Sequence, residues 1–69
     1  MDRIPVSSST ISAIGYEAES CTLEVEFNTG AVYQYSGVPQ EIYDALMQSD
    51  SKGRYLKANI KGRYGHTKL

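Results

Sequence analysis

A run of strict alternation near the middle of the chain most limits what this sequence can fold into. From Cys21 to Phe27, apolar and polar residues alternate, which is the period-two pattern of a half-buried β-strand. Asn28-Thr29-Gly30 then interrupts the pattern, and a second β-prone run extends from Ala31 to Ser36. Three loop residues that end in glycine suit a type I turn followed by a left-handed glycine bulge. We therefore expect a β-hairpin.

The length of the loop sets how the two strands pair, because a slip of one residue turns every side chain to the other face. The facing pairs for a three-residue loop are Phe27 with Ala31, Val25 with Tyr33, and Leu23 with Tyr35. A two-residue loop would instead bring Val32 and Gln34 beside Phe27 and Val25. We prefer the three-residue register because its shared face is the more apolar. The opposite face then carries Glu24, Glu26, Val32 and Gln34.

The rest of the chain predicts one more strand and two helices. A β-branched run from Ile11 to Tyr16 predicts the first strand, and a polar turn separates it from the hairpin. Pro39 suits the start of a helix that ends between Gln48 and Asp50, with acids near its first turn. Ser51 offers a cap for a second helix over residues 52–61, closed by Gly62. We expect an α+β domain: a three-stranded antiparallel meander followed by two helices packed on one face.

A chain of 69 residues allows one domain, over residues 1–69. Its core should lie within residues 7–64, with flexible ends at 1–6 and 65–69. The expected buried side chains are Leu23, Val25, Phe27, Ile42, Leu46, Leu56 and Ile60. A single cysteine cannot form an internal disulfide, and neither a signal peptide nor an apolar run long enough to span a membrane is evident. We therefore expect a cytoplasmic protein that does not contact membranes.

The formal net charge of −1 conceals a strong segregation of charge along the chain. Residues 1–50 hold all eight acids and one base, a formal charge of −7, whereas residues 51–69 hold six bases and no acid, +6. On the second helix, Leu56 and Ile60 share one side, and a basic stripe formed by Arg54, Lys57 and Lys61 occupies the other. Such asymmetry indicates a polyanionic partner, although the stripe could also be an ordinary solvated helix face.

Residues with catalytic or metal-binding chemistry are sparse. His66 is the one histidine, and no cysteine or second histidine stands at metal-ligand spacing from it. Glu24 and Glu26 lie about 7 Å apart on one strand face, where a solvated pair is a simpler interpretation than a glycosidase pair. We therefore expect no enzyme, no metal site and no cofactor.

Six tyrosines are a high load for so short a chain. A tyrosine ring can fill a core or offer a surface on which a nucleic-acid base stacks. The preferred register turns Tyr33 and Tyr35 toward the helices, which favours the core. Tyr55 and Tyr64 stand among the bases of residues 52–64, a mixture that suits phosphate contact together with stacking.

An ordered set of short motifs resembles the KTSC domain. These motifs are Ile14-Gly15-Tyr16-Glu17, Leu23-Glu24-Val25-Glu26-Phe27 with Gly30, Tyr33-Gln34-Tyr35, Val38-Pro39, Ile42-Tyr43, Leu46, Ser51-Lys52-Gly53-Arg54-Tyr55, Asn59-Ile60 and Tyr64. The resemblance covers about residues 7–64, and it departs from the family pattern at Leu56-Lys57, where Phe-Asn would follow Tyr55. The family occurs at the C-terminus of some lysyl-tRNA synthetases and as short stand-alone bacterial proteins.

The resemblance implies RNA binding only through this association, and it agrees with the basic, tyrosine-bearing last third of the chain. We therefore expect a small non-enzymatic module that binds RNA, with tRNA as one candidate. The expected contact residues are Tyr33, Tyr35, Arg54, Tyr55, Lys57, Lys61, Arg63 and Tyr64. The alternative is a protein-interaction module that uses an exposed strand edge or pairs with a second copy of itself.

Overall fold

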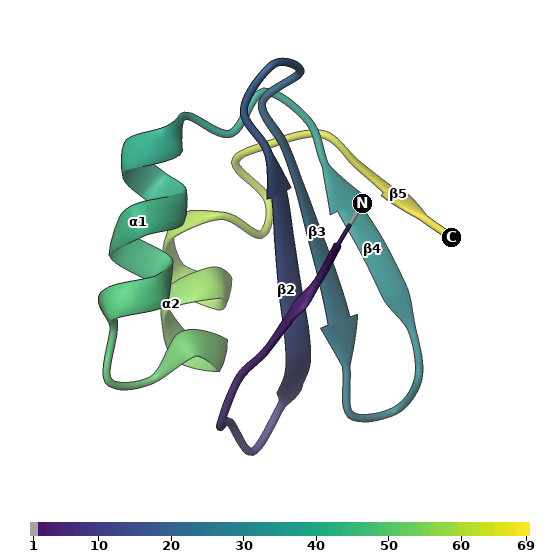
Figure 1. Cartoon of the computed structure of the whole chain (residues 1–69), viewed down its shortest axis with the longest axis vertical. Coiled ribbons are helices and arrows are strands. Elements are labelled where there is room, and N and C mark those ends of the chain that lie inside the picture. Colours follow the sequence, from purple (N-terminus) through teal and green to yellow (C-terminus); the bar gives the residue numbers. More distant parts are fainter. Residues whose placement is uncertain (1) are drawn as a thin grey trace.

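A five-stranded antiparallel sheet and two helices make up the computed structural model, which describes residues 2–69. The strands lie in the sheet in chain order, and both helices cover the same face of it (Figure 1). The elements are β1 (Ile4–Pro5), β2 (Ile11–Glu17), β3 (Thr22–Phe27), β4 (Val32–Tyr35), α1 (Gln40–Gln48), α2 (Lys52–Asn59) and β5 (His66–Lys68). The α+β class and the helices on one face were predicted correctly.

The β3–β4 hairpin has the register that its three-residue loop predicts. Leu23 pairs with Tyr35 and Val25 pairs with Tyr33, while the Phe27 amide donates to the Ala31 carbonyl at 2.8 Å. Gly30 closes the loop with a φ of +93°, a conformation that other residues adopt only with strain. Strand β3 begins one residue later than expected, because Cys21 has a left-handed φ of 54° and belongs to the preceding turn.

The expectation of three strands was wrong, because both ends of the chain add a strand. Residues Ile4–Pro5 pair with β2, and His66–Lys68 pair with β4. Most residues of the ends expected to be flexible are therefore hydrogen-bonded to the sheet, and Met1 lies outside the described residues. Neither short segment has the alternating pattern that would have predicted a strand. Such a pattern is not required here, because each segment pairs with an open edge of the sheet through main-chain hydrogen bonds and buries no side chain.

The two helices begin where their sequence signals predict. Helix α1 follows Pro39, and α2 follows Ser51, whose side chain makes no capping hydrogen bond. Helix α2 ends two residues earlier than expected, at Asn59, and Gly62 then reverses the chain with a φ of +83°. This reversal leads the chain back to the free edge of β4, where it forms β5. Neither helix within residues 2–69 is long and apolar enough to span a bilayer.

The core lies between the helices and the inner face of the sheet. Five of the seven side chains expected there are buried: Leu23, Val25, Leu46, Leu56 and Ile60. Phe27 and Ile42 are only half-buried, because each lies at the rim of the packed layer. Tyr35 is also buried, as the preferred hairpin register favoured, and three further core residues were not anticipated: Ile11, Ile14 and Val38.

The outer face of the sheet carries a compact polar network. Glu24 is 6% exposed, and its carboxylate accepts a hydrogen bond from Gln34 at 2.9 Å and forms an ion pair with Arg3. The same guanidinium lies 3.5 Å from Glu26. The bond from Gln34, and then the bond and charge of Arg3, lower the pKa of Glu24 against the opposing effect of burial. Glu24 and Glu26 are thus paired with Arg3 on the face of the sheet that lies away from the helices.

Candidate nucleic-acid interface

A groove of about 800 Å³ runs between α2 and the inner surface of the β3–β4 hairpin. One wall comes from α2 and the turn after it, and the floor comes from β3, β4 and β5. Its lining residues include three cations and four rings, and no carboxylate of residues 2–69 is among them. A volume of this size is within the range of small-ligand sites, roughly 300–1,000 Å³.

The basic stripe forms the helical wall of this groove. Arg54 and Lys57 lie one turn apart on α2, and Lys61 follows in the turn beyond the helix. All three are exposed, and none forms an ion pair in the part of the chain that the structure describes. The buried Leu56 anchors the helix to the core, while the three charged side chains stay exposed along the groove.

Four aromatic rings form the floor of the groove: Phe27, Tyr33, Tyr35 and His66. Phe27 and Tyr33 meet edge to face, with centroids 5.7 Å apart and an interplanar angle of 85°. His66 is tilted against both tyrosines, at 5.8 Å from Tyr33 and 5.9 Å from Tyr35. Strand β5 is what brings His66 here, because it pairs with Tyr35 in the sheet.

Tyr35 combines deep burial with an open hydroxyl. The residue is 3% exposed, and its hydroxyl has no hydrogen-bond partner among residues 2–69. Every fully enclosed side-chain nitrogen or oxygen of the described chain does have a partner, so this hydroxyl keeps some accessible surface, and Tyr35 is one of the residues that line the groove. Burial, followed by the neighbouring Tyr33, raises the pKa of Tyr35 above the usual value for tyrosine. The group therefore remains a protonated phenol at neutral pH.

One end of the groove is closed by a close approach between α2 and the segment before β2. A Cβ atom at Gly53 would lie 3.1 Å from Cβ of Thr10, which is tighter than ordinary contact. The same segment is hydrogen-bonded to the hairpin loop, since the main-chain N–H of Asn28 donates to the Thr10 carbonyl at 2.9 Å. Glycine in the first turn of α2 thus allows the basic wall to lie close to the hairpin.

Five of the eight residues expected at the site line this groove: Tyr33, Tyr35, Arg54, Lys57 and Lys61. The other three do not. Tyr55 and Tyr64 are half-buried against the core, and Arg63 is exposed beyond the early end of α2. The sequence places Phe27 in the expected core and His66 in an end expected to be flexible, so neither was predicted at the site. The alternation that ends at Phe27, beside the loop, was the one available signal that this ring lies at an edge.

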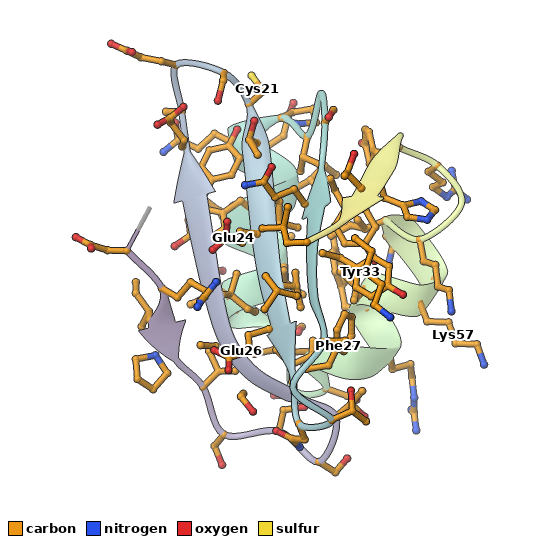
Figure 2. The ribbon with its side chains drawn as sticks, turned by 90° about the vertical axis from the view of Figure 1, so that its right-hand side faces the viewer. Cys21, Glu24, Glu26, Phe27, Tyr33 and Lys57 are labelled. Carbon is orange, nitrogen blue, oxygen red and sulfur yellow. The ribbon has the colours of Figure 1, made fainter. Side chains whose placement is uncertain are left out.

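The acids of the first fifty residues lie away from the groove. Glu24 and Glu26 are held by Arg3 on the outer face, and in Figure 2 they lie over the sheet, away from the edge at which Lys57 projects. Glu41 and Asp44 belong to α1 and do not line the groove. The segregation of charge along the sequence is therefore preserved in space on the groove side.

Comparisons with known proteins agree with this architecture. The sequence matches the KTSC domain over residues 7–64. It is 41% identical over 64 residues to an uncharacterised protein of Stutzerimonas stutzeri, covering 93% of this chain and 90% of that one. A lysine–tRNA ligase of Nostoc punctiforme is 36% identical over 61 residues, which are 88% of this chain but 11% of the ligase.

The fold has a close counterpart among solved structures. The crystal structure of a KTSC domain protein from Yersinia pestis superposes with a TM-score of 0.96 at 41% identity, covering 99% of this chain and 96% of that one. Identity at this level over nearly the whole length of both chains reflects common descent as well as a common fold. Together with the match over residues 7–64, it shows that this chain belongs to the KTSC domain family.

Proposed function

We propose that this protein is a non-enzymatic RNA-binding module and that the groove beside α2 is its contact surface. The observation that carries the proposal is the joining of Arg54, Lys57 and Lys61 with aromatic rings in one groove without a carboxylate among its described lining residues. Cations attract phosphates without any need for base contacts, and rings offer stacking surfaces. The match to part of a lysine–tRNA ligase adds support, because that enzyme acts on tRNA.

A protein-binding role has weaker support from the geometry. Addition of a strand needs a long, unprotected sheet edge. Here β1 has two residues and includes Pro5, while β5 has three residues and includes Lys68. Short strands, proline and lysine at edges all discourage pairing with another chain. A hydrolytic role has weak support too, because the groove offers one imidazole with no carboxylate partner among its described lining residues.

The test is the salt dependence of binding to a fluorescently labelled single-stranded RNA oligonucleotide, followed by anisotropy. If three phosphates are neutralised, the slope of log K against log salt should be roughly −0.7 for each, or about −2. Affinity should then fall by about 15- to 20-fold between about 50 and 200 mM salt. Replacing Arg54, Lys57 and Lys61 together by Glu should abolish binding while the thermal melt stays close to that of the parent, because exposed changes cost little.

A matched control variant changes the net charge of the protein by the same amount through three residues outside the groove. Replacing Lys52, Arg63 and Lys68 by Glu leaves every groove cation in place. If binding depends on this groove, the control should retain most of its affinity. Equal loss in both triple variants would mean that overall charge governs binding, and no binding by the parent protein at about 50 mM salt would reject the RNA proposal.

A further inference from the structure

We propose that the groove selects single-stranded RNA by seating one unpaired, unstacked base on its aromatic floor, with the flanking phosphates along the basic wall. This inference rests on the proposed RNA-binding function and specifies which state of RNA the site accepts. It also assigns the Tyr35 hydroxyl as the polar group that meets the edge of the seated base. Four features of the groove carry it.

The first feature is that no two rings of the floor are stacked face to face, and that three of the four, Phe27, Tyr33 and His66, keep exposed surface. Phe27 meets Tyr33 at 85°, and His66 is tilted by 48° and 42° against Tyr33 and Tyr35. By contrast, Tyr16 and Tyr43, outside the groove, lie parallel at 9° with centroids 4.7 Å apart and occupy each other's faces. Because these rings do not cover one another in parallel stacks, the half-buried rings of Phe27 and Tyr33 and the exposed ring of His66 retain surface on which a base can stack, whereas Tyr35 is buried.

The second feature is the arrangement of cations beside these rings. Arg54 and Lys57 project from successive turns of α2, about 5 Å apart along its axis, and Lys61 continues the series. A nucleic-acid backbone that follows the helix can therefore contact more than one of them. Because wall and floor belong to the same groove, a base attached to that backbone can turn onto the rings.

The third feature is size. A groove of about 800 Å³ is comparable to a small-ligand site, so it suits a nucleotide unit and not the width of a double helix. Bases inside a duplex already stack on each other, so their faces are unavailable to protein rings. An unpaired base has both faces free, which is why a stacking floor discriminates between the two states of RNA.

The fourth feature is the one uncommitted polar group at the floor. The Tyr35 ring is held in place by burial, and Tyr35 lines the groove, while its hydroxyl is not fully enclosed and has no hydrogen-bond partner among residues 2–69. A phenol both donates and accepts hydrogen bonds, so it can meet a carbonyl, a ring nitrogen or an exocyclic amine of a base. Because burial fixes the ring, little freedom is lost when the bond forms.

The experiment compares three RNA probes of equal length by anisotropy at one salt concentration: a single strand, the same strand with internal abasic sites, and a blunt duplex. Three variants accompany the parent: Tyr33→Leu removes a ring from the floor, Tyr35→Phe removes only the hydroxyl, and Tyr55→Leu is a control tyrosine outside the groove. Circular dichroism melts establish that each variant is folded.

We expect the single strand to bind at least tenfold more tightly than the duplex or the abasic strand. Tyr33→Leu should weaken binding of the single strand by roughly 5- to 150-fold without changing the salt slope, because stacking is lost while phosphate contacts remain. Tyr35→Phe should weaken it by roughly 2- to 12-fold and leave the abasic strand unaffected. Tyr55→Leu should leave all three affinities unchanged.

The outcomes separate this inference from the proposed function. Equal affinity for all three probes, with the salt slope intact, would overturn base seating while leaving RNA binding in place. A Tyr35→Phe effect of the same size on the abasic strand would overturn the role assigned to the hydroxyl. A parent protein that binds none of the probes at low salt would overturn the inference and the proposed function together.

Discussion

Replacing Arg3 by Met should destabilise this fold at neutral pH, because Arg3 is one of two donors to a buried carboxylate. Glu24 is 6% exposed and would retain only the bond from Gln34. A hydrogen bond to a charged group contributes about 1.5–3 kcal/mol. The Arg3 side chain is 33% exposed, so solvent screens the pair and the lower end applies, about 1.5–2 kcal/mol. In a domain of this size that corresponds to a fall in Tm of roughly 6–16 °C.

The effect should depend on pH in a definite direction. The donors lower the pKa of Glu24 in the folded protein below its value in the unfolded chain. A group of this kind contributes stability that is fully present above the unfolded pKa, about 4.3 for Glu, and is lost as the pH falls through the folded pKa. The difference in free energy of unfolding between the parent and Arg3→Met should therefore be largest near pH 7 and shrink toward acid.

Urea unfolding of four proteins isolates the pair: the parent, Arg3→Met, Glu24→Gln, and the double variant. The double variant should be more stable than Arg3→Met alone, because a neutral amide at position 24 is less costly to bury than an unpaired charge. An Arg3→Met protein within about 0.5 kcal/mol of the parent at pH 7 would refute the reasoning. So would a loss of stability that is the same at neutral and acid pH.

Three further perturbations test other parts of the fold. Leu46→Ala empties a fully buried position and should cost about 2–5 kcal/mol by urea unfolding; a cost below 1 kcal/mol would mean that α1 packs loosely. Tyr16→Phe removes the hydrogen bond from the Tyr16 hydroxyl to the Val38 carbonyl at 2.6 Å and should lower the free energy of unfolding by about 1 kcal/mol in the same assay. An unchanged free energy of unfolding would mean that this hydrogen bond does not stabilise the fold. Gly30→Ala meets no neighbouring atom but must adopt a φ of +93°, so its Tm should fall by an amount equivalent to about 1–2 kcal/mol; an unchanged Tm would contradict the left-handed turn.

The features that could be predicted from the sequence are those set by short-range rules. The hairpin register followed from the number of loop residues between Phe27 and Ala31, and the helix starts followed from Pro39 and Ser51. The basic stripe was predicted from helical periodicity, which holds even though Lys61 falls just beyond α2. In each case neighbouring residues alone determine the geometry.

The features that could not be predicted depend on pairing between distant segments. Strand β5 forms because the chain reverses at Gly62 and meets the free edge of β4. The segment His66-Thr67-Lys68 itself has no sequence pattern that predicts a strand. Without that strand, His66 has no position in the fold and the groove has no complete floor. Composition likewise does not say whether a half-buried ring such as Tyr55 or Tyr64 faces a groove or the core.

The loop of residues 28–30 makes binding and folding sensitive to the same class of mutation. Because side chains alternate between faces, deletion of one residue from this loop would turn Tyr33 and Tyr35 away from α2 and bring Gln34 toward the core. A single deletion would thus remove the aromatic floor of the groove and deprive the Glu24 carboxylate of its hydrogen bond from Gln34. Substitutions at Asn28 and Thr29 preserve the count of residues and so preserve both faces. In a deep mutational scan, positions 28 and 29 should accept many replacements of residue type, position 30 should accept few, and all three should reject single-codon deletions.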